Sequence, residues 1–142
     1  MSVLEKGFDK YFMAQYENNA YFWQKVDTLF LSSEINLNRK KGDVHPVFKN
    51  LIYPTDYGHV TDTKSVTSEG VSVYAGSGDR NKITALVVAA DILAKELDVK
   101  MLIGCTDQEV EDVLRFLNQT DLQKTVLIRR GNDIPAWSYS DN

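Results

Sequence analysis

The amino-acid sequence predicts a small β-barrel of the α+β class, with about five to six strands. Three observations lead to this fold. Several short segments have the β-branched or alternating composition of strands, one segment in the C-terminal half has a strong helical pattern, and two further helical segments precede the strands. Many short strands combined with a few added helices favour a small barrel over a layered α/β fold.

The chain has 142 residues and a formal net charge of −4. This length suits a single domain. Within it we expect a helical extension over residues 1–32, a barrel over 33–130 that contains a helix over 107–118, and an irregular tail over 131–142. The acidic balance argues against a broad nucleic-acid surface, which needs an excess of clustered Lys and Arg.

The sequence also bears on where the protein works. It contains one cysteine, Cys105, which excludes an internal disulfide and is typical of a reducing compartment. No run of 18 or more apolar residues predicts a membrane span, and the N-terminus lacks the pattern of a secretory signal. We therefore expect a cytoplasmic protein that has no membrane partner.

The first 32 residues predict two helices, over 2–17 and 20–32, separated by Asn18 and Asn19. Asparagine competes with the helical backbone, so this pair indicates a break. Apolar and aromatic residues recur at the three- and four-residue spacing of one buried stripe. Such an aromatic stripe is either part of the core or an interface through which the protein forms a homo-oligomer.

Strand patterns follow the helices. Residues 35–39 alternate between apolar and polar side chains, as a half-buried strand does. We expect further strands over 71–75, 83–90, 99–104 and 125–128. The segment from Asp91 to Leu97 is a turn or a short helix, because its periodicity does not separate the two.

The helix over 107–118 has the clearest signals. Thr106 and Glu109 have the spacing of a capping box, in which each side chain bonds the backbone of the other residue. Apolar residues then follow at i, i+3, i+4 and i+7, at Val110, Val113, Leu114 and Leu117.

The segment Leu51–Val60 is the most unusual part of the chain. Pro54 fixes its own φ and favours an extended Tyr53, while Gly58 permits an approach that a side chain would prevent. This composition predicts a rigid turn that holds Asp56 and Tyr57 at a bend. Such a turn either joins two core strands or forms a rim that presents polar groups to a ligand.

A second candidate feature is the pair Asp98 and Lys100. In a strand these positions point to the same face, so the carboxylate and the ammonium lie side by side. The pair is either a surface ion pair of small energetic value or part of a phosphate site. In the second case the carboxylate would hold a divalent cation and the lysine an anion. Cys105 precedes a helix that can lower its pKa, but a buried structural thiol is the more common case.

The order of these motifs resembles soluble family I inorganic pyrophosphatase, and more closely a short bacterial pyrophosphatase-like group. The similarity runs from about Trp23 to Arg130 and rests on several matched segments. These are Glu34-Ile35, Arg39-x-Lys41-Gly42, His45-Pro46, Tyr53-Pro54-x-Asp56-Tyr57-Gly58, residues 73–77, residues 100–106 and Leu127-Ile128-Arg129-Arg130.

The resemblance implies an OB-like five-stranded barrel whose mouth binds Mg²⁺ and pyrophosphate. In this family a metal-activated water attacks the phosphoanhydride bond. The implied catalytic residues are Asp98, Tyr57 and Lys100. The implied substrate-binding residues are Lys41, Arg39, Tyr57, Lys100 and Arg130, and the implied metal ligands are Asp91, Asp98 and Glu69.

One family signature departs from its pattern. The family has Asp-Gly-Asp-Pro-x-Asp after the Tyr-Gly turn, whereas this chain has Thr67-Ser68-Glu69-Gly70-Val71-Ser72. Hydroxyls replace carboxylates poorly as ligands of a hard cation. Three hypotheses follow: a pyrophosphatase-like protein with an impaired metal site and a retained phosphate pocket, an active Mg²⁺-dependent diphosphatase with rearranged ligands, or a non-catalytic interaction module.

Overall fold

A computed structural model of the chain describes residues 9, 12–13 and 16–131. The chain forms two compact units, one of Met1–Leu29 with Arg130–Asn142 and the other of Phe30–Arg129. The expected helix over 2–17 lies mostly outside the described residues, and the expected tail lies outside them from residue 132 onward. None of the helices in the described part of the chain is long and apolar enough to span a membrane.

Helix α3, Ala20–Leu31, confirms the expected second helix. Its start depends on Asn19, whose side-chain oxygen accepts hydrogen bonds from the backbone N–H groups of Tyr21 and Phe22 at 2.9 and 3.2 Å. The predicted asparagine break is thus an N-cap. Tyr21 and Phe22 are 44% and 47% exposed, and the homo-oligomer that such aromatic side chains suggest stays a prediction.

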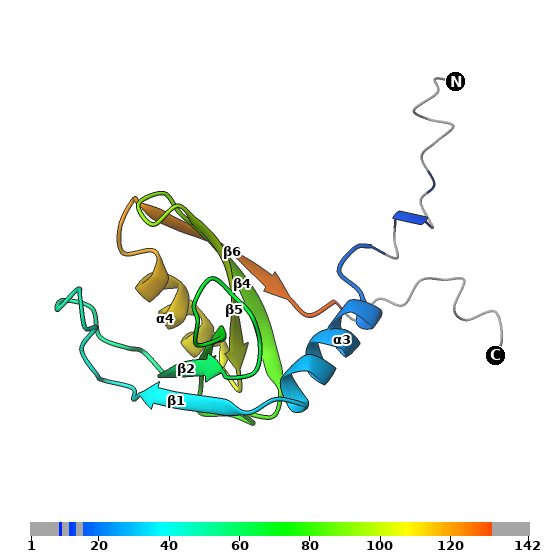
Figure 1. Ribbon diagram of the computed structural model, residues 1–142, viewed down its shortest axis with the longest axis horizontal. Helices are drawn as coiled ribbons and strands as arrows, with labels where there is room; N and C mark the ends of the chain where they lie inside the picture. The colour runs from blue at the N-terminus through cyan, green and yellow to red at the C-terminus, as the bar shows by residue number, and fades with distance from the viewer. Residues whose placement is uncertain (1–8, 10–11, 14–15, 132–142) are drawn as a thin grey trace, which may run out of the picture. The chain divides into compact units, whose positions relative to one another are not determined.

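Six strands form one open, mixed sheet in the order β1-β2-β3-β5-β4-β6 (Figure 1). The sheet is antiparallel except between β3 and β5, which run parallel. The strands are β1 Ile35–Arg39, β2 Asp56–Val60, β3 Val71–Ala75, β4 Ile83–Asp91, β5 Glu96–Ile103 and β6 Gln123–Arg129. The mixed α+β class is confirmed. The sheet does not close into the expected barrel, because β1 and β6 are its two edges and each pairs with one neighbour within the described strands.

The structure settles the segment between β4 and β5. These strands form an antiparallel hairpin in which Asp91 pairs with Glu96, so the segment is a turn and not a helix. Asp91 begins the turn by accepting hydrogen bonds from the N–H groups of Leu93 and Ala94. Lys95 completes the turn with a positive φ of 57°.

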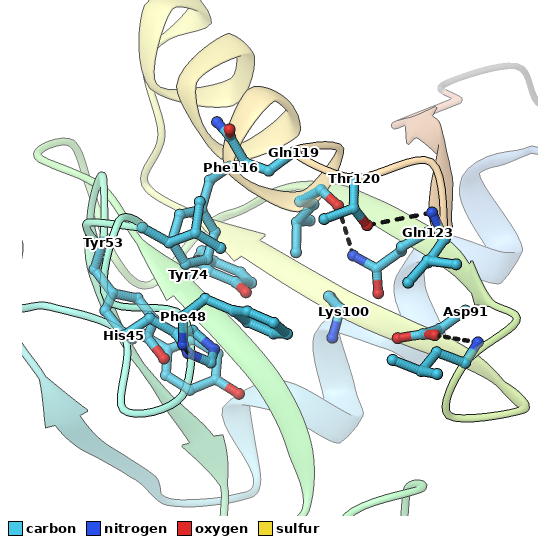
Figure 2. A pocket seen from close by; sticks show the side chains of 15 residues that line it. His45, Phe48, Tyr53, Tyr74, Asp91, Lys100, Phe116, Gln119, Thr120 and Gln123 are labelled. Carbon is cyan, nitrogen blue, oxygen red and sulfur yellow. Dashed lines mark hydrogen bonds between the residues drawn. The ribbon is translucent and has the colours of Figure 1, made fainter.

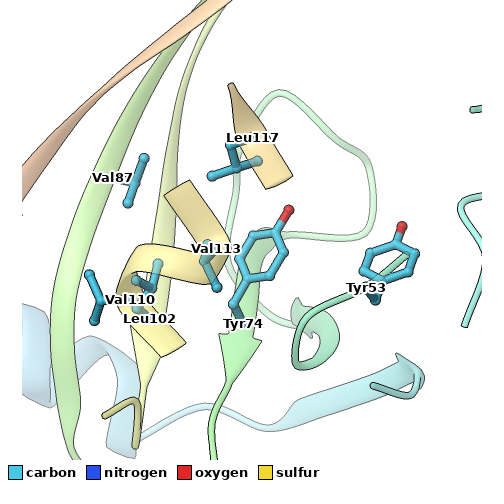
Figure 3. Close-up of a cluster of buried hydrophobic side chains, with 7 residues drawn as sticks. All are labelled: Tyr53, Tyr74, Val87, Leu102, Val110, Val113 and Leu117. Carbon is cyan, nitrogen blue, oxygen red and sulfur yellow. The ribbon is translucent and has the colours of Figure 1, made fainter. Parts of the chain in front are cut away.

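Helix α4, Asp107–Leu117, packs on one face of the sheet (Figure 3). The predicted capping box is confirmed, with Thr106 and Glu109 each bonding the backbone of the other. Val110, Val113 and Leu117 form the buried stripe of the helix. They contact a cluster contributed by the loop before β2 and by three strands, namely Tyr53, Tyr74, Val87 and Leu102. This face of the sheet, together with α4, positions the site described below.

The sheet edge at β1 depends on Gly58 in the predicted turn segment. Gly58 pairs with Leu37 across the β1–β2 ladder. A Cβ atom at Gly58 would overlap the backbone carbonyl of Asn36. The close approach of the two backbones explains why this position has no side chain.

We expect Gly58→Ala to destabilise the protein by about 3 kcal/mol, because β1 must move away from β2 to make room. A matched control is Gly42→Ala. Gly42 has a φ of 92° and open space around its Cβ position, so its substitution should cost only about 1 kcal/mol of backbone strain. Urea unfolding followed by circular dichroism measures both. Equal costs for the two variants would contradict the steric argument.

Candidate functional site

A cavity of about 280 Å³ opens beside the C-terminal end of α4 (Figure 2). The sheet face forms its floor, and the loop before β2, the β4–β5 turn and the segment after α4 form its walls. Aromatic and polar side chains line it together. The lining residues are His45, Phe48, Leu51, Tyr53, Tyr57, Tyr74, Asp91, Leu93, Lys100, Phe116, Leu117, Gln119, Thr120, Leu122 and Gln123.

Strand register brings the floor residues together. Tyr57 on β2 pairs with Tyr74 on β3, and Tyr74 pairs with Leu102 on β5. Lys100 lies two residues before Leu102, so its side chain points to the same face. The floor of the cavity is therefore built from three neighbouring strands, although its residues are far apart in the sequence.

Lys100 brings a positive charge into this cavity. Its side chain is 14% exposed, and its ammonium donates a hydrogen bond to Asp98 Oδ2 at 3.0 Å. Asp98 Oδ1 in turn accepts from the Ser65 hydroxyl at 3.0 Å. An ammonium has three N–H donors, and the bond to Asp98 accounts for one of them. The buried carboxylate thus fixes the amine while donors remain for a ligand.

A second network of polar side chains begins at Tyr57. Its hydroxyl lies 3.1 Å from Ser72 Oγ and 3.4 Å from His59 Nε2. His59 Nδ1 lies 3.1 Å from a carboxylate oxygen of Glu69, which is largely exposed. Ser72 and His59 are buried, so this network of contacts provides partners for their polar atoms inside the fold. Ser72 pairs with Lys100 across β3 and β5.

The loop before β2 provides the aromatic wall. His45 Nδ1 accepts hydrogen bonds from the N–H groups of Val47 and Phe48, both at 3.1 Å. A nitrogen that accepts cannot carry a proton, so the imidazole is neutral in this arrangement. Burial and the nearby charge of Arg39 lower the pKa of His45, which agrees with the neutral form.

Aromatic rings continue from this loop onto the sheet and α4. Tyr53 lies 5.9 Å from His45 in a stacked arrangement, 5.2 Å from Tyr57 and 5.0 Å from Phe116, between ring centroids. Tyr74 lies 4.9 Å from Tyr57. Burial raises the pKa of Tyr74 well above its usual value and also raises the pKa of Tyr53. The two phenols are therefore neutral over the physiological range.

The predicted site residues fall into two groups. Tyr57, Lys100 and Asp91 line the cavity, and Asp98 holds Lys100. The other four residues predicted for the site are engaged elsewhere or lie outside the cavity lining: Arg39, Lys41, Glu69 and Arg130.

The second group has varied surroundings. Arg39 lies near His45 and Tyr53, where its charge acts on the pKa of both side chains. Lys41 is exposed, and its backbone N–H donates to Asp56. Arg130 belongs to the other unit, where its guanidinium bonds both carboxylate oxygens of Asp27 and lies 4.9 Å from the centroid of a Trp23 ring. The substrate-binding roles expected for these basic residues stay predictions.

The carboxylates expected to bind Mg²⁺ do not converge. Asp91 caps its own turn, Asp98 is bonded to Lys100 and Ser65, and Glu69 is paired with His59. Among the described residues no group of three or more His, Cys, Asp or Glu side chains has the arrangement of a metal site. A hard divalent cation needs several oxygens directed at one point, so this donor set does not fit a magnesium centre.

Several cavity residues were missed by the sequence analysis. Phe48, Phe116 and Gln123 carry no motif, and His45 was considered only as part of the His45-Pro46 segment that resembles the pyrophosphatase family. Phe116 lies outside the apolar stripe of α4, and this was the one available signal that it has a role other than helix packing.

Cys105 is a structural thiol. It is partly buried, and its backbone N–H donates to the Thr84 hydroxyl at 2.9 Å. Burial and the nearby Glu109 raise the pKa of the thiol to about 11. The thiol is therefore protonated at neutral pH, and the helix that follows does not activate it.

The predicted turn is fastened by Asp56. One carboxylate oxygen accepts the backbone N–H of Lys41 at 2.9 Å, and the other forms an ion pair with Arg80 at 2.9 Å. The hydrogen bond from Lys41 and the charge of Arg80 lower the pKa of Asp56. Arg80 also donates to the carbonyls of Ala75 and Gly76, so the turn is tied to the end of β3.

Comparisons with models of known protein families, with curated proteins and with solved structures give no match. The resemblance to family I pyrophosphatase therefore stays a prediction that rests on the motifs quoted above.

The lowered pKa of Asp56 makes a prediction about acid stability. Ionised Asp56 contributes stability above the unfolded pKa of about 3.9, and this contribution disappears as the pH falls through the lower folded value. We expect Asp56→Asn to be about 1 kcal/mol less stable than the natural chain at pH 6, after allowing for solvent screening. The difference should shrink as the pH approaches 3.

Urea unfolding at a series of pH values measures this difference. Asp121→Asn is the control, because Asp121 is fully exposed and forms a 3.4 Å ion pair with Lys124. Its difference from the natural chain should stay close to zero at every pH. A difference for Asp56→Asn that does not change between pH 6 and pH 3 would contradict the assignment.

Proposed function

We propose that the chain binds a small anionic molecule in the cavity beside α4, with Lys100 as the residue that contacts the anionic group. The observation that carries this proposal is the ammonium of Lys100 in the cavity lining, held by the buried carboxylate of Asp98. Burying a lysine is costly unless it is paired. The chain keeps this charge where a ligand can reach it.

Binding is favoured over hydrolysis by the arrangement of the carboxylates. Asp91, Asp98 and Glu69 each have partners inside the protein and do not converge. Hydrolysis of a phosphoanhydride by the pyrophosphatase route needs a metal-activated water. We therefore favour the first of the three sequence hypotheses, a pyrophosphatase-like protein with an impaired metal site and a retained anion pocket.

The finer fold assignment belongs to the same proposal. We propose that the mixed sheet is related to an OB-like barrel, of which β1 and β6 would be the unjoined edges. The support is the order of the motifs along the chain, from Arg39-x-Lys41-Gly42 through Tyr53-Pro54 to Asp98-x-Lys100.

The alternative to the proposed anion binding is an active Mg²⁺-dependent diphosphatase with rearranged ligands. The next experiment separates these two functions.

We expect pyrophosphate and inorganic phosphate to shift the backbone amide NMR signals of residues 57, 72 and 100, and Lys100→Met to weaken this binding at least tenfold. A tenfold loss corresponds to about 1.4 kcal/mol, which is reasonable for the loss of a charge-assisted hydrogen bond. Lys124→Met is the control, because Lys124 is also paired with an aspartate but is 65% exposed on an edge strand.

Lys100→Met leaves Asp98 buried without its partner and is expected to lower stability. The double variant Lys100→Met with Asp98→Asn removes both charges and keeps the test valid if the single variant unfolds. Release of phosphate from pyrophosphate is measured in the same samples with Mg²⁺ added. Turnover in the natural chain would favour the diphosphatase. Unchanged binding in Lys100→Met and in the double variant would disprove the proposal.

A further inference from the structure

Phe48 is an exposed aromatic residue in a rigid position. The residue is 48% exposed, although phenylalanine is among the residues that are most often fully buried. The backbone around it is fixed at both ends: Phe48 N–H donates to His45 Nδ1, and the Phe48 carbonyl accepts from Leu51 N–H at 2.9 Å. The fold therefore holds the backbone of Phe48 in place although the side chain is half exposed.

The ring of Phe48 lines the same cavity as Lys100 (Figure 2). His45 contributes a second ring, 5.3 Å from that of Phe48 and 6.3 Å from that of Phe116. Both His45 and Phe116 are only partly buried. Three partly exposed rings thus lie together on one side of a cavity whose floor carries the ammonium of Lys100.

We infer that the ligand of this cavity is an aryl anion, a molecule in which one flat unsaturated ring carries the anionic group. This inference rests on the proposed anion pocket. The flat ring packs against Phe48, His45 and Phe116, and the anionic group meets Lys100. Aromatic rings attract one another by about 0.5–1.5 kcal/mol beyond the area that they bury. A bare phosphate or pyrophosphate would leave the three rings exposed to water.

The size of the cavity limits the ligand further. Small-molecule sites usually enclose roughly 300–1,000 Å³, and this cavity has about 280 Å³. It suits one ring and one anionic group, and not a dinucleotide. The polar side chains of Gln119, Thr120 and Gln123 also line the cavity. Two of them have partners within the protein, because Gln123 donates to the Leu117 carbonyl and the Thr120 hydroxyl accepts from the N–H of Leu122.

The test compares three phosphates on the full chain by calorimetry or NMR titration: phenyl phosphate, cyclohexyl phosphate and inorganic phosphate. Phenyl and cyclohexyl phosphate carry the same charge and have similar size, but only the first is flat. We expect phenyl phosphate to bind about 3- to 10-fold more tightly than cyclohexyl phosphate and more tightly still than inorganic phosphate. Benzoate shows whether a carboxylate serves in place of a phosphate.

Two variants locate the ring contact. Phe48→Leu keeps the apolar volume but removes the ring, so it should abolish most of the preference for phenyl over cyclohexyl phosphate. Val47→Ala is the control, because Val47 is 70% exposed and does not line the cavity. It should leave all affinities unchanged. Because Phe48 is half exposed, its substitution is not expected to unfold the protein.

The outcomes separate this inference from the proposed function. Equal affinities for phenyl, cyclohexyl and inorganic phosphate would overturn the aryl inference and leave the anion pocket intact. A preference for phenyl phosphate that persists in Phe48→Leu would also overturn it. Binding of none of the four anions would overturn the anion pocket itself. Tighter binding of benzoate than of phenyl phosphate would support an aryl carboxylate as the ligand.

Discussion

The ion pair between Lys100 and Asp98 is the constraint around which the site is built. Both side chains belong to β5, one of the two central strands, and both are largely buried. Removing one partner of a buried pair typically costs about 3–5 kcal/mol, so the sheet must keep the two together. The alternation of β5 then places the amine on the face under α4, and Ser65 and Ser72 are positioned around it by the neighbouring segments.

The same constraint explains the chemical character of the cavity. A carboxylate that neutralises a lysine is poorly placed to serve as a metal ligand, and the hydroxyl of Ser72 lies 3.1 Å from that of Tyr57. The central charge of the site is therefore the amine of Lys100. Phenols, phenyl rings and the neutral imidazole of His45 also line the cavity. Such surroundings support the proposed binding of an organic anion.

Local patterns predicted the elements of the fold well and their assembly less well. The capping box at Thr106 and the asparagine before α3 each depend on neighbours a few residues away, and each is confirmed. The strand predicted over residues 35–39 is also confirmed, but its first four residues are all exposed, so the expected half-buried face is wrong. The openness of the sheet depends on which strands become edges, and strand pairing over long distances leaves no such local pattern. The register that sets Tyr57, Tyr74 and Lys100 on one floor is equally non-local. Phe48 could not be identified, because a phenylalanine in a loop carries no signal until the cavity is known.

The cavity combines three stretches of the chain: the loop before β2, the β4–β5 hairpin, and the end of α4 with the segment after it. None of the three can form the cavity alone, so the binding-competent state is the assembled sheet with its helix in place. Any ligand that occupies the cavity is therefore thermodynamically linked to folding of the whole Phe30–Arg129 unit. At one hundred times its dissociation constant such a ligand would add about 2.7 kcal/mol to the free energy of unfolding. Resistance to heat is thus a direct reporter of occupancy, and a library of compounds can be searched through it before any reaction is known.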